Sequence, residues 1–224
     1  MSSTAPKHDD RPVVVAIAGT AEDHATLEWA AEEAASSGRR LLLTHAAGHL
    51  PPEMSYAERH VARAEVRARS QRLLDEAVTW VHRLVPSVPV ETLVRLLRPE
   101  ALLPAVGDQA AAVTRTAASW QRRRARQGRP VVAALRDAES DRHVLHFAVD
   151  YADRRGVDLL VLEDRGPDAS RRVVERSGST SLVLVARPGH HRPGSPPARA
   201  GWGTAFDVLQ RSESPVVLVS PERG

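Results

Sequence analysis

The sequence contains no cysteine, which excludes disulfide bonds and metal sites with thiolate ligands and leaves a reducing compartment open. Lysine is almost absent as well, since Lys7 is the sole lysine among 31 basic residues, and the formal net charge is only +3. No apolar run approaches the roughly 20 residues that a membrane-spanning helix needs, and the N-terminus lacks the apolar segment of a signal peptide. We therefore expect a cytoplasmic protein that does not bind a membrane.

One stretch of the sequence occurs twice. Residues 11–42 align without a gap on residues 129–160, and 12 of these 32 positions are identical, among them Asp23/Asp141 and Gly38/Gly156. Such a repeat indicates that two copies of one supersecondary unit head two related halves. We divide the chain accordingly into a disordered N-terminus (1–10), a first domain (11–115), an arginine-rich linker (116–128) and a shortened second domain (129–224).

The repeated unit has the pattern of a strand, a helix and a second strand. The apolar run 13–18 is typical of a buried strand, and apolar residues then recur at helical spacing. Thr20 and Asp23 are placed to share the first free amides of the helix, and Gly38 to end it. A second apolar run, 41–45, follows at once. The pattern predicts the α/β class, with two doubly wound, Rossmann-like parallel-sheet halves.

Each half lacks elements that the other has. The first half offers a long charged helix (56–84) and a third strand (88–97), but then only the poor strand pattern AAAVTRTA and an arginine-rich segment with no buried strand. The second half has room for one or two helical turns near Val173 and Val174 instead of a long helix and third strand. It then offers a strand at 181–186, a helix at 204–211 and a last strand at 214–220. We therefore expect two incomplete halves.

Several segments together resemble the universal stress protein family. These are the PVVV strand, the Gly-Thr turn after it, the helix ending in EWAAEEAASSG, the LLLTHA strand, the long helix and the terminal PVVLV strand. The likeness covers nearly all of residues 11–220 and makes the chain similar to a tandem, two-domain member. It implies five-stranded parallel sheets, dimers formed through the last strand, a role in stress response and, in one subset, ATP or AMP bound at the carboxyl ends of the strands.

The nucleotide site that the resemblance implies transfers badly to this sequence. Nucleotide-binding members end the first strand in an aspartate followed by a small residue and Ser or Thr. The matching positions are Ala18-Gly19-Thr20 and Arg136-Asp137-Ala138, so neither half has the aspartate in register. The glycine loop after the fourth strand matches only in part, because Gly189, Gly194, Gly201 and Gly203-Thr204 have the wrong spacing and four prolines remove amide donors.

The candidate nucleotide-binding residues are therefore Gly19, Thr20, Gly203 and Thr204. For Gly203 and Thr204 we favour a helix cap over an anion site. We accordingly expect no cofactor, with ATP or AMP as a disfavoured alternative.

Three further clusters could carry chemistry, and for each we favour a structural interpretation. His143, His146 and Asp150 share one helix face, but the apolar stripe lies elsewhere, which favours a solvated face over a metal site. His190-His191 lacks a third ligand. The run Arg122, Arg123, Arg124 and Arg126 beside Trp120 could contact phosphates, yet no nucleic-acid module accompanies it, so we favour a solvated linker helix and regard nucleic-acid binding as unlikely.

The sequence contains none of the enzyme motifs that we can recognise, including a P-loop, a nucleophile elbow and a dinucleotide fingerprint. We interpret the chain as a non-enzymatic protein of stress physiology that acts through oligomerisation or an unknown protein partner. An ATP- or AMP-binding sensor with a residual site in the second half, and an arginine-mediated nucleic-acid binder, are the alternatives. Because the first half lacks a last strand, Val216–Val219 would be an exposed edge, and we expect it to pair across a homodimer or with the first half's sheet.

Overall fold

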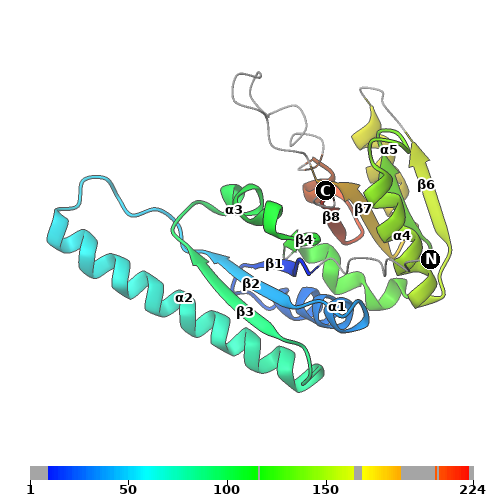
Figure 1. Ribbon diagram of the computed structural model, residues 1–224. Coiled ribbons are helices and arrows are strands. Elements are labelled where there is room, and N and C mark those ends of the chain that lie inside the picture. The colour runs from blue at the N-terminus through cyan, green and yellow to red at the C-terminus, as the bar shows by residue number, and fades with distance from the viewer. Residues whose placement is uncertain (1–9, 116, 164–167, 188–204, 206, 222–224) are drawn as a thin grey trace, which may run out of the picture.

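The computed structural model describes residues 10–115, 117–163, 168–187, 205 and 207–221. Their strands form one eight-stranded sheet in the order β3-β2-β1-β4-β8-β7-β5-β6 (Figure 1). All neighbouring strands run parallel except β4 and β8. The strands are β1 (Val13–Ile17), β2 (Leu41–Ala46), β3 (Val90–Arg95), β4 (Ala112–Arg115), β5 (Val131–Leu135), β6 (Leu159–Glu163), β7 (Leu182–Ala186) and β8 (Val216–Val219).

The repeated unit forms the same structure in both halves, as predicted. It consists of β1, α1 and β2 in the first half and of β5, α4 and β6 in the second. The register agrees as well, because Val13 pairs with Leu41 and their repeat counterparts Val131 and Leu159 also pair. Each half contributes four strands to the sheet, and the prediction of two incomplete α/β halves is confirmed.

Helices cover both faces of the sheet and define two apolar cores. On one face lie α1 (Asp23–Ser36), α2 (Tyr56–Leu84) and α4 (Arg142–Arg155). On the other face lie α3 (Pro99–Val106), α5 (Ala169–Ser177) and the helical residues 205 and 207–211. The fully buried β1 presents alternate valines to the two cores, which explains why its sequence is apolar throughout. In the part of the chain that the structure describes, none of the helices has the length and apolar character of a membrane-spanning segment.

The long helix α2 extends beyond the sheet that it covers (Figure 1). Its four buried residues all lie in its C-terminal half, from Ser70 onward, whereas Tyr56 and Val61 are exposed. The helix begins with a capping box, in which Ser55 accepts from the Glu58 amide and the Glu58 carboxylate accepts from the Ser55 amide.

Two sequence predictions for the middle of the chain are corrected. The poor strand pattern AAAVTRTA contains a genuine strand, β4, which hydrogen-bonds to β1 on one side and β8 on the other. The arginine-rich segment forms two 3-10 turns, η2 (Ala118–Arg122) and η3 (Arg124–Arg126), rather than a solvated linker helix. Position within the sheet therefore outweighs the weak local pattern of β4.

β8 lies inside the sheet and not at its edge. It pairs in parallel with β7 and antiparallel with β4, where Val113 lies opposite Leu218 and Ala112 opposite Val219. Of the two arrangements predicted for Val216–Val219, pairing with the first half's sheet is confirmed. A homodimer through this strand is not compatible with the structure, because both of its edges are already hydrogen-bonded within the chain.

Candidate functional site

The turn after β1 is closed by a carboxylate of the chain itself. The Asp23 side chain accepts hydrogen bonds from the amides of Ala18 (3.0 Å), Gly19 (2.7 Å) and Thr20 (2.9 Å). Asp23 is the first residue of α1 and is almost fully buried. Amides at a strand-to-helix turn are the groups that hold phosphates in many nucleotide sites. Here all three donate to an internal anion.

The backbone of this turn requires glycine at its centre. Gly19 has a φ of +84°, and a Cβ on it would lie 2.3 Å from Cδ1 of Leu73 on α2. The turn therefore lies directly beneath α2.

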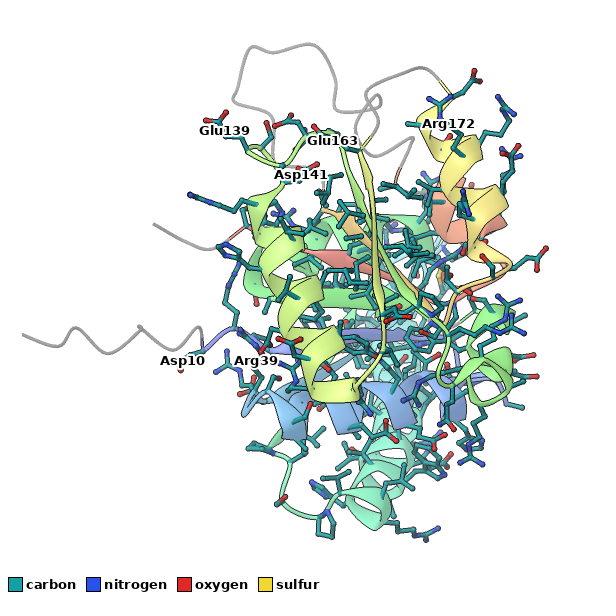
Figure 2. All side chains as sticks on the ribbon, turned by 90° about the vertical axis from the view of Figure 1, so that its right-hand side faces the viewer. Asp10, Arg39, Glu139, Asp141, Glu163 and Arg172 are labelled. Atoms are coloured by element: carbon teal, nitrogen blue, oxygen red, sulfur yellow. The ribbon has the colours of Figure 1, made fainter. Side chains whose placement is uncertain are left out.

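The second half repeats the arrangement with a different partner. The carboxylate of Asp141 accepts from the Arg136 amide (2.7 Å) and from the Arg136 guanidinium (2.5 Å), and Asp141 is fully buried. Figure 2 shows Asp141 at the same end of the sheet as Glu139 and Glu163. The ion pair raises the pKa of Arg136 above its ordinary value. This end of β5 is thus also occupied by a carboxylate of the chain.

A hollow with a volume of about 700 Å³ lies between the β1–α1 turn and α2. The His24 ring stacks on Trp80 with ring centroids 5.0 Å apart. The charged residues that line the hollow are Asp23, Arg69, Arg72, Glu76 and Arg83. The three arginines make the α2 side of the hollow suitable for an anion with an aromatic group, since Arg and an aromatic face recognise such ligands.

Comparison with solved structures decides the fold. A universal stress protein from Archaeoglobus fulgidus DSM 4304 aligns over 93% of this chain and 96% of its own, with a TM-score of 0.60 and 10% sequence identity. The chain has the universal stress protein fold. A universal stress protein family structure from Burkholderia pseudomallei covers 70% of this chain and 98% of its own, with 17% identity and a TM-score of 0.39. An Archaeoglobus fulgidus universal stress protein in complex with dAMP covers 93% and 97%, with 16% identity and a TM-score of 0.32. The sequence matches no family model, and no curated protein matches it.

In this universal stress protein fold, the predicted site residues fall into two groups. Gly19 and Thr20 line the hollow. Gly203 and Thr204 lie outside the described residues, as do His190 and His191. The predicted sharing of amides between Thr20 and Asp23 is corrected, because the Asp23 carboxylate accepts the three turn amides. The Thr20 hydroxyl instead bonds to Glu22, which lowers the pKa of that half-buried carboxyl.

The sequence placed Asp23 at the start of the helix but did not predict that the carboxylates of Asp23 and Asp141 close the two turns. Asp23 and Asp141 are one of the 12 identical pairs of the repeat, so the signal was present. They stand five residues after Ala18 and Arg136, the positions where the resemblance places a nucleotide-binding aspartate. This chain therefore has an aspartate in each unit, and both carboxylates accept hydrogen bonds from the chain's own amides.

The candidate metal ligands on α4 do not converge. His143 is hydrogen-bonded to the Val219 backbone, and burial lowers its pKa. Asp150 pairs with Arg154, and His146 is exposed. Among the described residues no group of three or more His, Asp or Glu side chains is placed to hold a metal ion.

The arginine run joins the two halves of the universal stress protein fold. On one side, Arg123 donates to Glu32 (2.6 Å) and Arg124 to Glu28 (2.8 Å), both on α1. Trp120, which precedes them, is buried and packs against Trp29 of the same helix with centroids 5.0 Å apart. This part of the linker is therefore bound to the first half.

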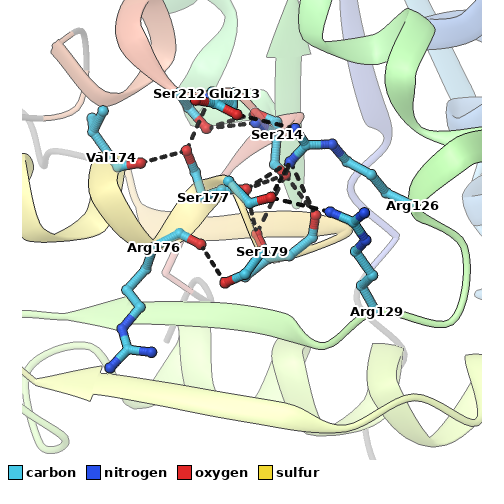
Figure 3. A network of polar contacts seen from close by, with 11 residues as sticks. Arg126, Arg129, Val174, Arg176, Ser177, Ser179, Ser212, Glu213 and Ser214 are labelled. Atoms are coloured by element: carbon cyan, nitrogen blue, oxygen red, sulfur yellow. Dashed lines mark hydrogen bonds and ion pairs between the residues drawn. The ribbon is translucent and has the colours of Figure 1, made fainter.

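Arg126 reaches into the second half (Figure 3). It is 7% exposed and donates to the carbonyl of Ser177 (2.8 Å) and the hydroxyl of Ser214 (2.7 Å). It also pairs with the Glu213 carboxylate at 3.3 Å. Because Arg123, Arg124 and Arg126 are all engaged within the chain, the run is a structural connection and a poor surface for phosphates.

Proposed function

We propose that this chain acts in stress response as a non-enzymatic cytoplasmic protein, through binding of a protein partner or of further copies of itself. The stress role rests on the likeness in fold, which is a weak guide to function by itself. The observation that carries the rest is the pair of buried carboxylates, Asp23 and Asp141, at the turns where a nucleotide would be held.

The physical argument concerns competition for the same donors. A phosphate at the first turn would have to displace the Asp23 carboxylate from three amides, and hydrogen bonds to a charged group are worth roughly 1.5–3 kcal/mol each. It would also approach the buried negative charge of Asp23 at the start of α1. Both effects disfavour ATP or AMP at this turn.

Isothermal titration calorimetry of the full chain with ATP and with AMP tests the proposal. We expect no saturable heat at millimolar ligand. A saturable signal with a stoichiometry near one per chain would contradict it.

A second candidate function is supported by the hollow beneath α2. Its arginines and the His24–Trp80 stack favour an anionic aromatic ligand, such as a nucleotide bound away from the turn amides. If the titration gives heat, Arg72→Ala should abolish it. The matched control is Arg67→Ala, an exposed arginine of the same helix that does not line the hollow. Heat that survives Arg72→Ala would direct attention to the predicted residual site at Gly203 and Thr204.

A further inference from the structure

The outer edge of β6, which has no strand beside it among the described residues, carries an exposed apolar surface. Val149 on α4 is 45% exposed, and Leu160 and Val161 on β6 are 38% and 48% exposed. Their repeat counterparts in the first half are Ala31, Leu42 and Leu43, which are 0%, 6% and 0% exposed. The same positions of the same unit are thus buried in one half and open in the other.

The difference has a structural cause. In the first half, β3 pairs with the outer edge of β2, and α2 packs over both strands. Within the described residues, the second half has neither a strand beyond β6 nor a counterpart of α2. The first half therefore shows what this surface accepts, which is another strand hydrogen-bonded to the edge.

The backbone of β6 determines which residues could bind that strand. The Val131 amide on β5 donates to the Asp158 carbonyl at 2.8 Å, so the even-numbered residues of β6 face β5. Leu159, Val161 and Glu163 then direct their amides and carbonyls to the open side. The first half agrees, since Leu41, the counterpart of Leu159, donates its amide to Pro89 next to β3. Figure 2 looks onto this side of the molecule, where β6 runs between α4 and α5.

We propose that the β6 edge is a homodimer interface, in which β6 of a second copy pairs antiparallel about a two-fold axis at Val161. This centre gives each outward residue a hydrogen-bonded partner, because Val161 meets Val161 and Leu159 meets Glu163 of the second copy. The same register places Leu160 opposite Leu162. Within Leu159–Glu163 no like charges stand opposite each other, and the exposed apolar side chains of β6 gain apolar neighbours.

The chain offers no better occupant for this edge. Residues 188–204 include four prolines, which cannot donate to a strand ladder, and residues 1–9 are mostly polar. The other end of the sheet, β3, carries Glu91 and Arg95, which are typical of a protected edge, whereas β6 has no charge before Glu163. Pairing of β6 with β3 of another copy would continue without closing, whereas pairing of β6 with itself closes as a dimer.

Light scattering coupled to size-exclusion chromatography tests the proposal on the full chain, over a series from micromolar to near-millimolar protein. We expect a dimer for the parent and for Val161→Thr, which keeps the amide and the β-branched shape. Val161→Lys and Val161→Glu each place like charges at the two-fold axis, so each should dimerise at least roughly tenfold more weakly.

The decisive measurement mixes the two charged variants. Because residue 161 of one copy lies opposite residue 161 of the other, a mixture of Val161→Lys and Val161→Glu should restore the dimer. Circular dichroism should show that each variant is folded. A parent that stays monomeric over the whole series would overturn the proposal. So would a dimer that both charged variants retain unchanged, or a mixture that associates no better than either variant alone.

Discussion

Glu33 is a fully buried carboxyl between the two repeats. It lies on α1, and its Oε1 accepts from Arg154 of α4 at 2.5 Å, while Oε2 has no hydrogen-bond partner in the described part of the chain. Burial raises the pKa of Glu33 to about 7, although Arg154 and other arginines act in the opposite direction. The carboxyl therefore holds a proton in the folded protein at a pH where the unfolded chain has lost it.

This difference predicts a pH-dependent stability. Between pH 4.5 and about 7 the folded state binds the additional proton, so the free energy of unfolding should fall as the pH rises, by at most about 3 kcal/mol from this residue. Glu33→Gln should remove that component, and the stability of the variant relative to the parent should rise over the same range. Urea unfolding at pH 5 and pH 8 measures it, with Glu100→Gln on the exposed side of α3 as control. Parallel pH profiles for parent and Glu33→Gln would rule the effect out.

At the residue level, the sequence predicts where the turns lie but not what fills them. Gly19 and Thr20 line the hollow, and their role in nucleotide binding stays a prediction. The role of Asp23 could not be predicted in full, because a carboxylate three residues after Thr20 is also the pattern of an ordinary helix start. Only the folded turn brings three amides onto one side chain.

At the level of elements, the linker is the part that the sequence describes least well. The run RRRARQ has no apolar periodicity, which is typical of a solvated segment. The partners of Arg126 lie 51 to 88 residues further along the chain, so no local pattern could indicate them. The repeated strands and helices, in contrast, have local apolar patterns and were predicted with nearly correct bounds.

The buried arginine gives a test of the linker's role. Arg126→Lys keeps the charge but removes the planar set of donors that serves Ser177, Ser214 and Glu213, and we expect a loss of about 2–3 kcal/mol in the free energy of unfolding. Arg124→Lys is the matched control, because that side chain is 75% exposed, and it should cost less than about 0.5 kcal/mol. Urea unfolding of both variants measures the difference. Equal costs would mean that the network does not join the halves.

At the level of the whole molecule, the repeat was sufficient to predict the fold class, and the sheet confirms it. The sequence did not determine how the two halves join, because the apolar pattern of β8 is compatible with a strand that pairs within the chain or between chains. The division into domains at 115 and 129 stays a prediction.

The position of β8 can be tested by proline substitution. Leu218 lies between Val113 and Val185 in the sheet, so Leu218→Pro should destabilise the fold by at least about 3 kcal/mol. Val161→Pro at the outer edge of β6 should leave the folded chain intact, because its amide faces away from β5, although it should abolish the proposed dimer. Thermal unfolding followed by circular dichroism separates the two. Equal tolerance of both prolines would place β8 at an edge.

The antiparallel pairing of β4 with β8 also affects how the protein is synthesised. β8 follows the seven other described strands in the sequence, so a ribosome synthesises it after its two neighbours, β4 and β7. Until then each neighbour has an open edge, and the two halves of the sheet have no strand between them. The nascent chain therefore lacks this strand until all of its neighbours have been made, a period in which chaperones would have unpaired strands to protect.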